Sequence, residues 1–376
     1  MICLAQKEEA RDLLCDRRFL ADWAALFSAC PWSTPFQSVG FASTWYQVYA
    51  PAIEPVLAYE RSRQGELIGL LLLAQNPAAG LICAGGNQAE YQGWLAHAEN
   101  GSDFIERAIQ ELAARQPASS LTFCYLPPGA PVDWALPGGI LGPLCQSEAV
   151  RRPLLALDDR DHIDSALRSK HMRVAVNRFK RQGDLRFERI TGSEAFDEIF
   201  DILIGYYDDR QQVTHRCRPF RDDPNKKLFH CRLMEIPELL HVTVLKAGEQ
   251  VISAHLGMCG NGVVHMLIPA QSPTFAKDSV GRVHMLMLAQ LLQQTQYRIL
   301  DLTPDENALK KQLATTYDAV HKVTVFLNRR AKIVHDGKQK ITAFARRTLA
   351  ACGLEPKAVK GLVARFRGVA SEKNPS

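Results

Sequence analysis

The first half of the chain combines two amphipathic segments with short apolar runs. Apolar spacing predicts a helix over residues 19–30 and another over residues 102–115, where Ile105, Ala108, Ile109 and Leu112 share one face. Apolar runs predict strands at residues 55–59, 67–74, 80–84 and 121–125. A stretch rich in proline and glycine over residues 127–143 ends this half. The pattern therefore predicts an α/β unit followed by a boundary or a long surface loop.

The second half has a more regular pattern. After a strand at residues 186–191, we expect a helix with one buried face, formed by Phe196, Ile199, Phe200, Leu203 and Tyr207. A helix around residues 224–235 comes next. Three strands joined by short turns then predict an antiparallel meander, at residues 239–246, 250–258 and 263–268. A helix, a strand, a helix and a strand follow, at residues 281–294, 298–302, 306–315 and 321–328. The predicted order is β α α β β β α β α β.

Length and composition indicate two folded domains. The chain has 376 residues, more than the ~100–200 of a typical domain. Its 47% hydrophobic and 23% charged residues exclude a disordered or fibrous protein. We expect one domain over residues 1–150, a second over residues 151–330 and a basic helical tail over residues 331–376.

Positive charge is concentrated in two segments. Residues 331–376 hold ten Lys or Arg against three Asp or Glu, in two short amphipathic stretches. For these we favour a helix hairpin packed on the body, or a frayed end, over peripheral contact with an acidic membrane or a partner. A predicted helix that ends at Gly183 carries six more cations, and a solvated face is favoured over a patch for an anionic substrate or cofactor. No DNA partner is expected.

Several other protein classes are not expected. The longest apolar run, residues 67–74, is far short of the ~20 residues of a membrane-spanning helix. The first residues include acidic side chains where a signal peptide would be basic. Ten cysteines are scattered without a CxxC pair, as in cytosolic proteins. The nearest approach to a metal cluster matches no zinc spacing, namely His215, Cys217, His230 and Cys231. We therefore expect a cytoplasmic protein without a metal site.

Several motifs of the chain resemble one known family. They are residues 254–257 (AHLG), the turn from Ser279 to Gly281, residues 301–304 (DLTP) with a following lysine, residues 318–325, and in the first half residues 34–46 and 89–96. Together they make the chain similar to the CelD/BcsL-like acyltransferases of bacterial polysaccharide gene clusters, a branch of the GNAT superfamily related to FemAB-like transferases. The predicted order of elements in the second half is also that of a GNAT domain.

The resemblance implies an α/β fold with mixed sheets, built from two tandem GNAT-like domains. It implies acyl-CoA binding by the second domain, and we interpret the first as a degenerate copy that shapes the acceptor cleft. The chain departs from the family pattern at Val280, where proline usually precedes the turn glycine. It also departs at Asp305 and Leu309, where glycine and an aromatic residue are common.

The candidate acyl-CoA site is the turn at Ser279, Gly281 and Arg282. A glycine-led turn that opens a helix exposes N–H groups and the positive end of the helix dipole to a pyrophosphate. A glycine at a helix start is usually only a cap. Its place after the third meander strand, where GNAT proteins hold CoA, favours the binding role.

The candidate catalytic residues are His255 and Asp301. Acyl transfer needs a base for the attacking nucleophile, and histidine can accept a proton near neutral pH. His255 lies in the middle of the second meander strand and is alternatively a hydrogen-bonded core residue. Asp301 ends the strand after the predicted CoA helix, where it could orient His255 or contact the acceptor. We expect the two side chains to act in one pocket.

Candidate acceptor contacts come from both halves. Glu90 and Tyr91 follow a pair of glycines after a strand, and polar residues in such loops commonly bind substrates. Lys310 lies in the helix after Asp301, where it could meet a phosphate or a sugar-linked acid.

These features predict an acyltransferase of the GNAT N-acetyltransferase type. It would use acetyl-CoA or another acyl-CoA and no metal, and would transfer the acyl group to nitrogen or oxygen of a small-molecule or lipid-linked sugar, an envelope or exopolysaccharide precursor. Two alternatives remain open: a FemAB-like peptidyltransferase that uses aminoacyl-tRNA, and a GNAT-like binding module without catalysis.

Overall fold

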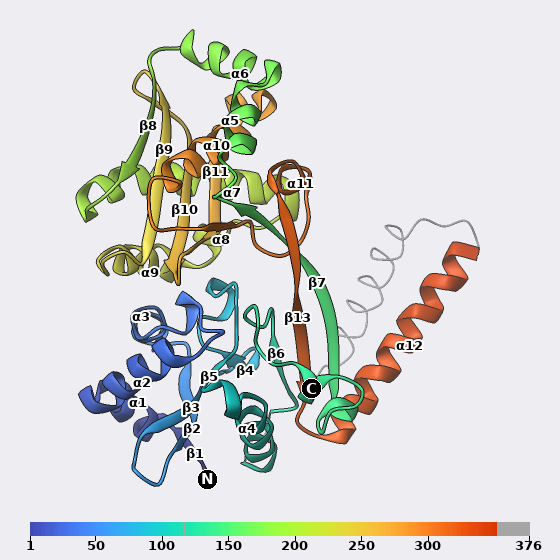
Figure 1. The fold of residues 1–376 in the computed structure, drawn as a ribbon. Coiled ribbons are helices and arrows are strands. Elements are labelled where there is room, and N and C mark those ends of the chain that lie inside the picture. The colour runs from blue at the N-terminus through green and yellow to red at the C-terminus, as the bar shows by residue number, and fades with distance from the viewer. Residues whose placement is uncertain (116–117, 352–376) are drawn as a thin grey trace, which may run out of the picture.

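The N-terminal domain is built on the smaller of two β-sheets (Figure 1). The structure is a computed structural model that describes residues 1–115 and 118–351. The smaller sheet has the order β1-β2-β3-β4, with β5 paired to β3, and all its pairings are antiparallel. Its strands are β1 (Ile2–Gln6), β2 (Glu54–Arg61), β3 (Leu67–Asn76), β4 (Gly80–Cys83) and β5 (Trp94–Ala96). The helices of this domain are α1 (Lys7–Cys15), α2 (Arg17–Ala29), α3 (Val39–Tyr49) and α4 (Gly101–Arg115).

The C-terminal domain is built on the larger sheet, with the order β6-β13-β7-β12-β11-β10-β9-β8. Only the pairing of β11 with β12 is parallel among the strand pairs of the described residues. The strands are β6 (Ser120–Phe123), β7 (Cys145–Ala156), β8 (Leu185–Ile190), β9 (Leu240–Ala247), β10 (Gln250–Gly260), β11 (Val263–Gln271), β12 (Ile299–Asp301) and β13 (Thr316–Phe326). The helices are α5 (Arg160–Arg168), α6 (Lys170–Lys180), α7 (Ser193–His215), α8 (Pro219–Asp222), α9 (Pro224–Met234), α10 (Val280–Leu292), α11 (Ala308–Leu313) and α12 (Arg329–Ala351).

Two long strands, β7 and β13, connect the domains. They pair from Thr316 and Leu154 at one end to Val325 and Cys145 at the other, and Figure 1 shows them running from one domain to the other. The far end of β13 pairs with β6, which precedes the proline- and glycine-rich stretch. The boundary expected after residue 150 thus falls inside β7.

Helices cover both faces of the larger sheet and define two cores. On one face, α5, α6 and α10 bury Ile163, Phe179 and Leu286 against β11 and β12. On the other face, α7 and α9 bury Phe200 and Phe229. This second core is continuous with the core of the N-terminal domain. The two domains therefore share one apolar interior, and the face of the sheet on the α7 side is turned toward the N-terminal domain.

The order predicted for the second half agrees with the observed elements from β8 to β13 except for the short helix α8, which was not predicted. The apolar faces explain this agreement, because the predicted residues of α7 are buried from Phe196 to Leu203. The basic helix differs from the prediction. It is divided into α5 and α6 at Ser169, whose side chain accepts a hydrogen bond from the backbone N–H of Met172. Strand β1 and helix α1 were not predicted.

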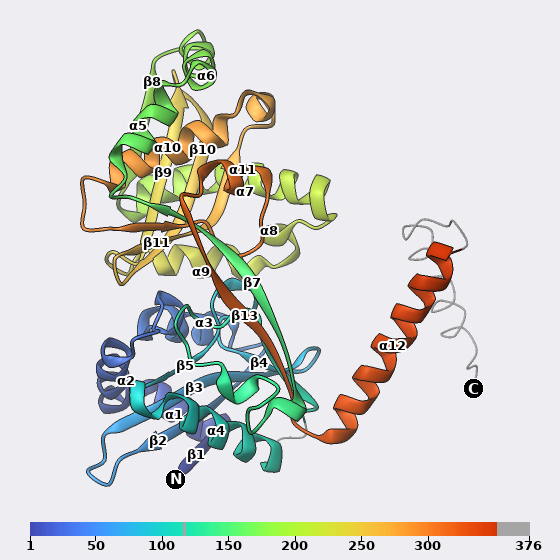
Figure 2. The same cartoon turned by 45° about the vertical axis from the view of Figure 1, so that its right-hand side comes forward.

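Helix α12 leaves the body of the protein (Figure 2). Near its start, His335 Nε2 lies 2.9 Å from Gln146 Oε1 at the beginning of β7. The second predicted amphipathic stretch of the tail, residues 356–369, lies outside the described residues. In the described part of the chain, no helix has both the length and the apolar character needed to cross a membrane.

Candidate functional site

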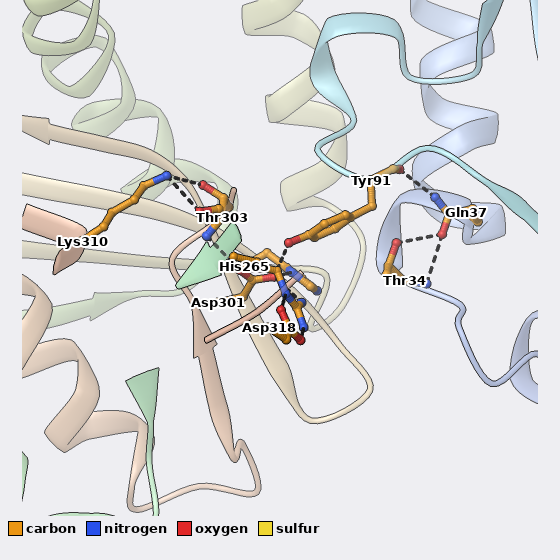
Figure 3. A network of polar contacts seen from close by, with 9 residues as sticks. Thr34, Gln37, Tyr91, His265, Asp301, Thr303, Lys310 and Asp318 are labelled. Atoms are coloured by element: carbon orange, nitrogen blue, oxygen red, sulfur yellow. Dashed lines mark hydrogen bonds and ion pairs between the residues drawn. The ribbon is translucent and has the colours of Figure 1, made fainter. Parts of the chain in front are cut away.

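Asp301 is the centre of a buried polar cluster between the two domains (Figure 3). It ends β12 and is 0% exposed. One carboxylate oxygen, Oδ2, accepts hydrogen bonds from the Tyr91 hydroxyl at 2.6 Å and from Arg152 Nη1 at 3.1 Å, and it lies 3.0 Å from His265 Nδ1. The other oxygen accepts from the backbone N–H of Thr303 at 2.8 Å. Tyr91 comes from the N-terminal domain, so this carboxylate joins both halves of the molecule.

The charge state of Asp301 follows from these donors. Burial alone would raise its pKa, but the contact with His265, the charges of His265 and Arg152, and the Tyr91 hydroxyl together hold the pKa at about 2. The carboxylate is therefore ionised at neutral pH and can only accept hydrogen bonds. It follows that Nδ1 of His265 carries a proton and donates a hydrogen bond to Asp301.

Arg152 connects the cluster to β13. Its Nε donates to Asp318 Oδ1 at 2.7 Å, and its Nη2 donates to the other oxygen of Asp318. The side chain of Arg152 is 8% exposed, whereas that of Asp318 is 43% exposed. A buried guanidinium between two carboxylates satisfies the usual condition for a buried charge, which is that it be paired.

Lys310 holds the loop that follows Asp301. The Lys310 ammonium group donates to Thr303 O at 3.0 Å, Thr303 Oγ1 at 3.1 Å and Pro304 O at 2.9 Å. Burial lowers the pKa of Lys310, although nearby acids including Glu90 oppose the shift. Thr303 and Asp305 both have φ near +66°, a backbone region that residues other than glycine rarely adopt. The three hydrogen bonds of Lys310 therefore stabilise a strained turn at the edge of the cluster.

Glu90 lies in the N-terminal loop, next to Tyr91. Burial raises the pKa of its carboxyl group to about 7, and the charges of Asp301 and Asp305 add to the effect while Lys310 opposes it. A carboxyl group with this pKa exchanges its proton near neutral pH, which suits acid–base chemistry. The predicted acceptor residues Glu90, Tyr91 and Lys310 are thus brought together around Asp301.

The sheet opens directly beyond the cluster. Strand β11 pairs with β12 only through Val263, Val264 and His265, because β12 ends at Asp301. The rest of β11 has no strand on this side. A small cavity of about 20 Å³, room for about one water, lies there. Gln271, Gly281 and Leu309 are among its lining residues.

The predicted acyl-CoA turn borders this opening. Ser279 precedes α10 and has φ +59°, and the first N–H groups of α10 lack acceptors within the helix. A Cβ atom on Gly281 would lie 2.7 Å from Gln271 Oε1, so the first turn of α10 packs closely against the end of β11. Arg282 follows, and its Nε atom is buried without a hydrogen-bond partner.

The predicted pairing of His255 with Asp301 is wrong. Met258 of β10 pairs with His265, and side chains alternate along a strand, so His255 and His265 lie on opposite faces of the sheet. His265 faces the N-terminal domain, whereas His255 lies under α10, with its ring 6.3 Å from that of His284. His255 is 0% exposed, has no hydrogen-bond partner, and its pKa is well below its usual value because of burial and the neighbouring histidines. It does line the small cavity beside Gly281.

Sequence reasoning missed His265 and Arg152. The register of β11 against β12 places His265 beside Asp301, and that of β7 against β13 places Arg152 beside Asp318. A sequence signal existed in the alternation of the segment VVHMLI, which isolates His265 as the polar position of an apolar strand.

The four residues that were considered and rejected as a metal cluster, His215, Cys217, His230 and Cys231, do not belong to the polar cluster around Asp301. His230 is buried, and its Nδ1 lies 2.7 Å from the carbonyl oxygen of Lys226. Within residues 1–115 and 118–351, no group of three His, Cys, Asp or Glu side chains is placed to hold a metal ion.

One known protein family is similar to the C-terminal domain. Residues 166–311 match the family described as acetyltransferase (GNAT) domain. No curated protein matches the chain. This part of the chain is therefore similar to a GNAT domain, and the match includes β8 to β12 and the turn at Gly281.

Solved structures resemble most of the chain. FemX is similar with a TM-score of 0.53 at 10% identity, over 80% of this chain and 95% of FemX. The C-terminal domain of a protein assigned as lysylphosphatidylglycerol synthetase from Agrobacterium fabrum gives 0.51 at 12% identity, over 85% and 95%. A protein of unknown function from Bacteroides thetaiotaomicron gives 0.51 at 12% identity, over 82% and 97%. These likenesses concern the fold alone. The predicted fold of two tandem GNAT-like domains is confirmed.

Proposed function

We propose that the chain is an acyl-CoA-dependent N- or O-acyltransferase that acts in the cytoplasm on a sugar, an envelope or exopolysaccharide precursor. The observation that carries the proposal is the open edge of β11 beside the N-terminus of α10, next to an ionisable cluster between the domains. The resemblance to CelD/BcsL-like acyltransferases supports a polysaccharide precursor as the acceptor. The identity of the acceptor remains a prediction.

The donor binds along the open edge of β11 in this proposal. The pyrophosphate of acyl-CoA contacts the first turn of α10 at Ser279, Gly281 and Arg282, where the N–H of Gly281 and the helix dipole favour an anion, while the N–H of Arg282 donates to Ser279 O. The acyl end then points toward Asp301. Because the present cavity holds about one water, the side chains of Gln271 and Leu309 must move to admit the donor.

The acceptor binds between the domains. Three residues are candidate contacts with the acceptor. The hydroxyl of Tyr91 and the ammonium group of Lys310 already form hydrogen bonds within the protein. Among the described residues, the carboxyl group of Glu90 has no hydrogen-bond partner. We assign Tyr91 and Lys310 the role of holding the two walls of the acceptor site in place, and Glu90 that of direct contact.

Helix α12 favours a lipid-linked acceptor. Its described part exposes Ile333, Val334 and Ile341 to solvent, together with Lys338 and Lys340. Basic amphipathic helices bind anionic membrane surfaces through both kinds of side chain. We therefore propose that α12 brings the enzyme to the membrane that carries the acceptor.

A second candidate function is transfer from aminoacyl-tRNA. The specific observation in its favour is the basic surface of α6, where Lys170, Arg173 and Lys180 are exposed. A polyanionic donor would be attracted by such a surface.

Donor binding is the experiment that tests the proposal. Calorimetry should detect acetyl-CoA or a longer acyl-CoA binding to the full chain. Gly281→Glu should weaken that binding by about 100-fold, because a carboxylate facing the pyrophosphate costs several kcal/mol. The substitution should fold, since the atom that meets the new side chain is the mobile end of Gln271.

The matched control is Gly205→Glu, which adds the same charge to an exposed position of α7 with open space around it. It should bind acyl-CoA as the unmodified chain does. Equal binding by Gly281→Glu would remove the donor assignment. A melting point raised by tRNA and by no acyl-CoA would replace it with the aminoacyl-tRNA function, and no ligand effect at all would indicate a binding module.

A further inference from the structure

A second cavity lies between the domains, on the other side of His265 from the opening of the sheet. It measures about 170 Å³ and lies against β11 at Val263 and His265. Its walls include Trp32 and Pro128 from the N-terminal domain and Arg152 and Asn261 from the C-terminal part. This volume is below the ~300–1,000 Å³ of sites for drug-sized ligands, so the cavity suits one ring or one head group of a larger molecule.

His265 is held firmly at the wall of this cavity. Its Nδ1–H donates to the ionised Asp301 at 3.0 Å (Figure 3). Its ring packs edge-to-face on Phe36 and Tyr91, with centroids 5.6 and 5.5 Å away. Since Nδ1 is bound to a buried carboxylate, Nε2 is the ring nitrogen that faces the cavity, and it has no hydrogen-bond partner among the described residues. When the ring is neutral and its proton is on Nδ1, Nε2 has a free lone pair and can accept a proton.

The chemistry of the lining distinguishes between possible acceptors. Arg152 is the one side chain with a permanent charge among the described residues that line the cavity. Arg152 is paired with Asp301 and Asp318, so neither carboxylate is free to pair with an ammonium group, whereas a hydroxyl compound needs no counter-ion. The donors of Thr34 and Asn261 are engaged with Gln37 and Ser33, which leaves their oxygens as acceptors for hydroxyl groups. Together with Trp32 and the adjoining prolines, these oxygens suit a polyhydroxylated ring.

We propose that His265 is the general base of an O-acyl transfer, and that the acceptor hydroxyl is held in this cavity while Asp301 orients the imidazole. The inference rests on the proposed function and narrows it from N- or O-transfer to O-transfer. His265 is the last residue of β11 that pairs with β12, so it stands between the acceptor cavity and the opening assigned to the donor.

The reaction balances without any further reagent. The acceptor oxygen attacks the thioester carbonyl carbon as its proton passes to His265 Nε2, so a C–O bond forms. The C–S bond then breaks, and the imidazolium returns the proton to the departing CoA thiolate. The products are an ester and free CoA, and Asp301 stays ionised throughout, as in other dyads of this kind.

The test is His265→Asn, whose amide can still donate to Asp301 but has no group in place of Nε2. With acetyl-CoA as donor and N-acetylglucosamine, glucosamine and methyl glucoside as acceptors, kcat should fall by ~10²- to 10⁴-fold while the Kd for acetyl-CoA stays within about twofold. Added imidazole should restore part of the rate in His265→Ala, which a purely structural role would not allow. The product should be cleaved by mild alkali, as esters are and amides are not.

The matched control is His241→Asn, which makes the same change at a histidine that is 0% exposed, lies on the other face of the sheet and borders neither cavity. Its kcat should stay within about threefold of the unmodified chain. The inference is overturned if His265→Asn retains a comparable kcat, if the product is an alkali-stable amide, or if a chain that binds acetyl-CoA acylates none of the hydroxyl compounds. A chain that fails to bind any acyl-CoA would instead remove the proposed function itself.

Discussion

The two faces of the C-terminal sheet both bury histidines, but they surround them differently. On the face toward the N-terminal domain, His265 shares Asp301 with a tyrosine and an arginine. On the face under α10, His241 and His255 have no hydrogen-bond partner, and His284 has only Thr243 at its Nε2. All four rings are at most 3% exposed. Burial is therefore common to both groups of histidines. A carboxylate partner is what distinguishes His265, the histidine placed for proton transfer, from the histidines under α10.

The difference has an energetic meaning that can be measured. A buried polar atom without a partner costs free energy, whereas a buried charge with several donors is stable only while the whole set is present. The α10 face should therefore tolerate the loss of a histidine, and the interdomain face should not tolerate the loss of its acceptor. Three substitutions test this contrast.

Asp301→Ala should have the largest effect. It leaves Arg152, Tyr91 and His265 buried without their shared acceptor, and breaking a buried ion pair by removing one partner typically costs ~3–5 kcal/mol. Chemical denaturation should show this loss in the free energy of unfolding. The control is Asp318→Ala, which removes the 43% exposed partner of the same arginine and should cost ~1 kcal/mol or less. Equal costs for the two variants would contradict the contrast between the faces.

Tyr91→Phe should have the next largest effect. It removes one hydrogen bond to a buried carboxylate, and bonds to charged groups contribute ~1.5–3 kcal/mol. Tyr46 provides the comparison, because its buried hydroxyl donates to the neutral carbonyl oxygen of Leu73 at 2.7 Å. Tyr46→Phe should cost only ~0.5–1.5 kcal/mol by the same measurement. If the order of the two costs is reversed, the carboxylate does not stabilise the interface as we describe.

The pH dependence of stability tests the α10 face. Burial, with a smaller contribution from Arg189, lowers the pKa of His241 to about 4, whereas an unfolded histidine titrates near ~6.5. Between these values the unfolded state binds the extra proton, so the free energy of unfolding should fall by ~1.4 kcal/mol per pH unit for this residue as the solution is acidified. Above pH ~6.5 the residue should contribute no slope.

His241→Leu should remove the contribution of this histidine to the loss of stability in acid. Urea titrations of both proteins between pH 7 and pH 4.5 would show a smaller slope for the variant, and at neutral pH its stability should be equal or higher, because an unpartnered polar ring is gone. Parallel curves for the two proteins would mean that His241 titrates normally in the fold.

Much of the fold could be predicted because each element depends on its own residues. The buried positions of α7 and the meander of β9, β10 and β11 are local patterns of apolar side chains. Strand β13 was expected to begin at residue 321 but begins at Thr316. Its first residues are mostly exposed, and pairing with β7 forms them into a strand. Such long-range pairing leaves no local signal.

The sequence indicated individual residues of the candidate site, but not the contacts between them. Asp301, Tyr91 and Lys310 were selected individually, and the structure places them in one cluster. The pairing of His255 with Asp301 was wrong because alternation gives two faces of a strand but does not say which face meets the other domain. The contact between Tyr91 and Asp301 spans 210 positions of the sequence, and only the packing of the two domains creates it.

The long pair of β7 and β13 also sets an order for biosynthesis. Strand β6 belongs near the N-terminal domain, yet its partner in the sheet is the end of β13, about 200 residues later in the chain. Leu121 and Phe123 join the N-terminal core together with Val323 and Val325. The first domain therefore cannot complete its interior while the ribosome is still translating the second. Folding of this protein has to wait for residue 326, and until then the edge of β6 and its apolar neighbours are exposed to chaperones or to aggregation.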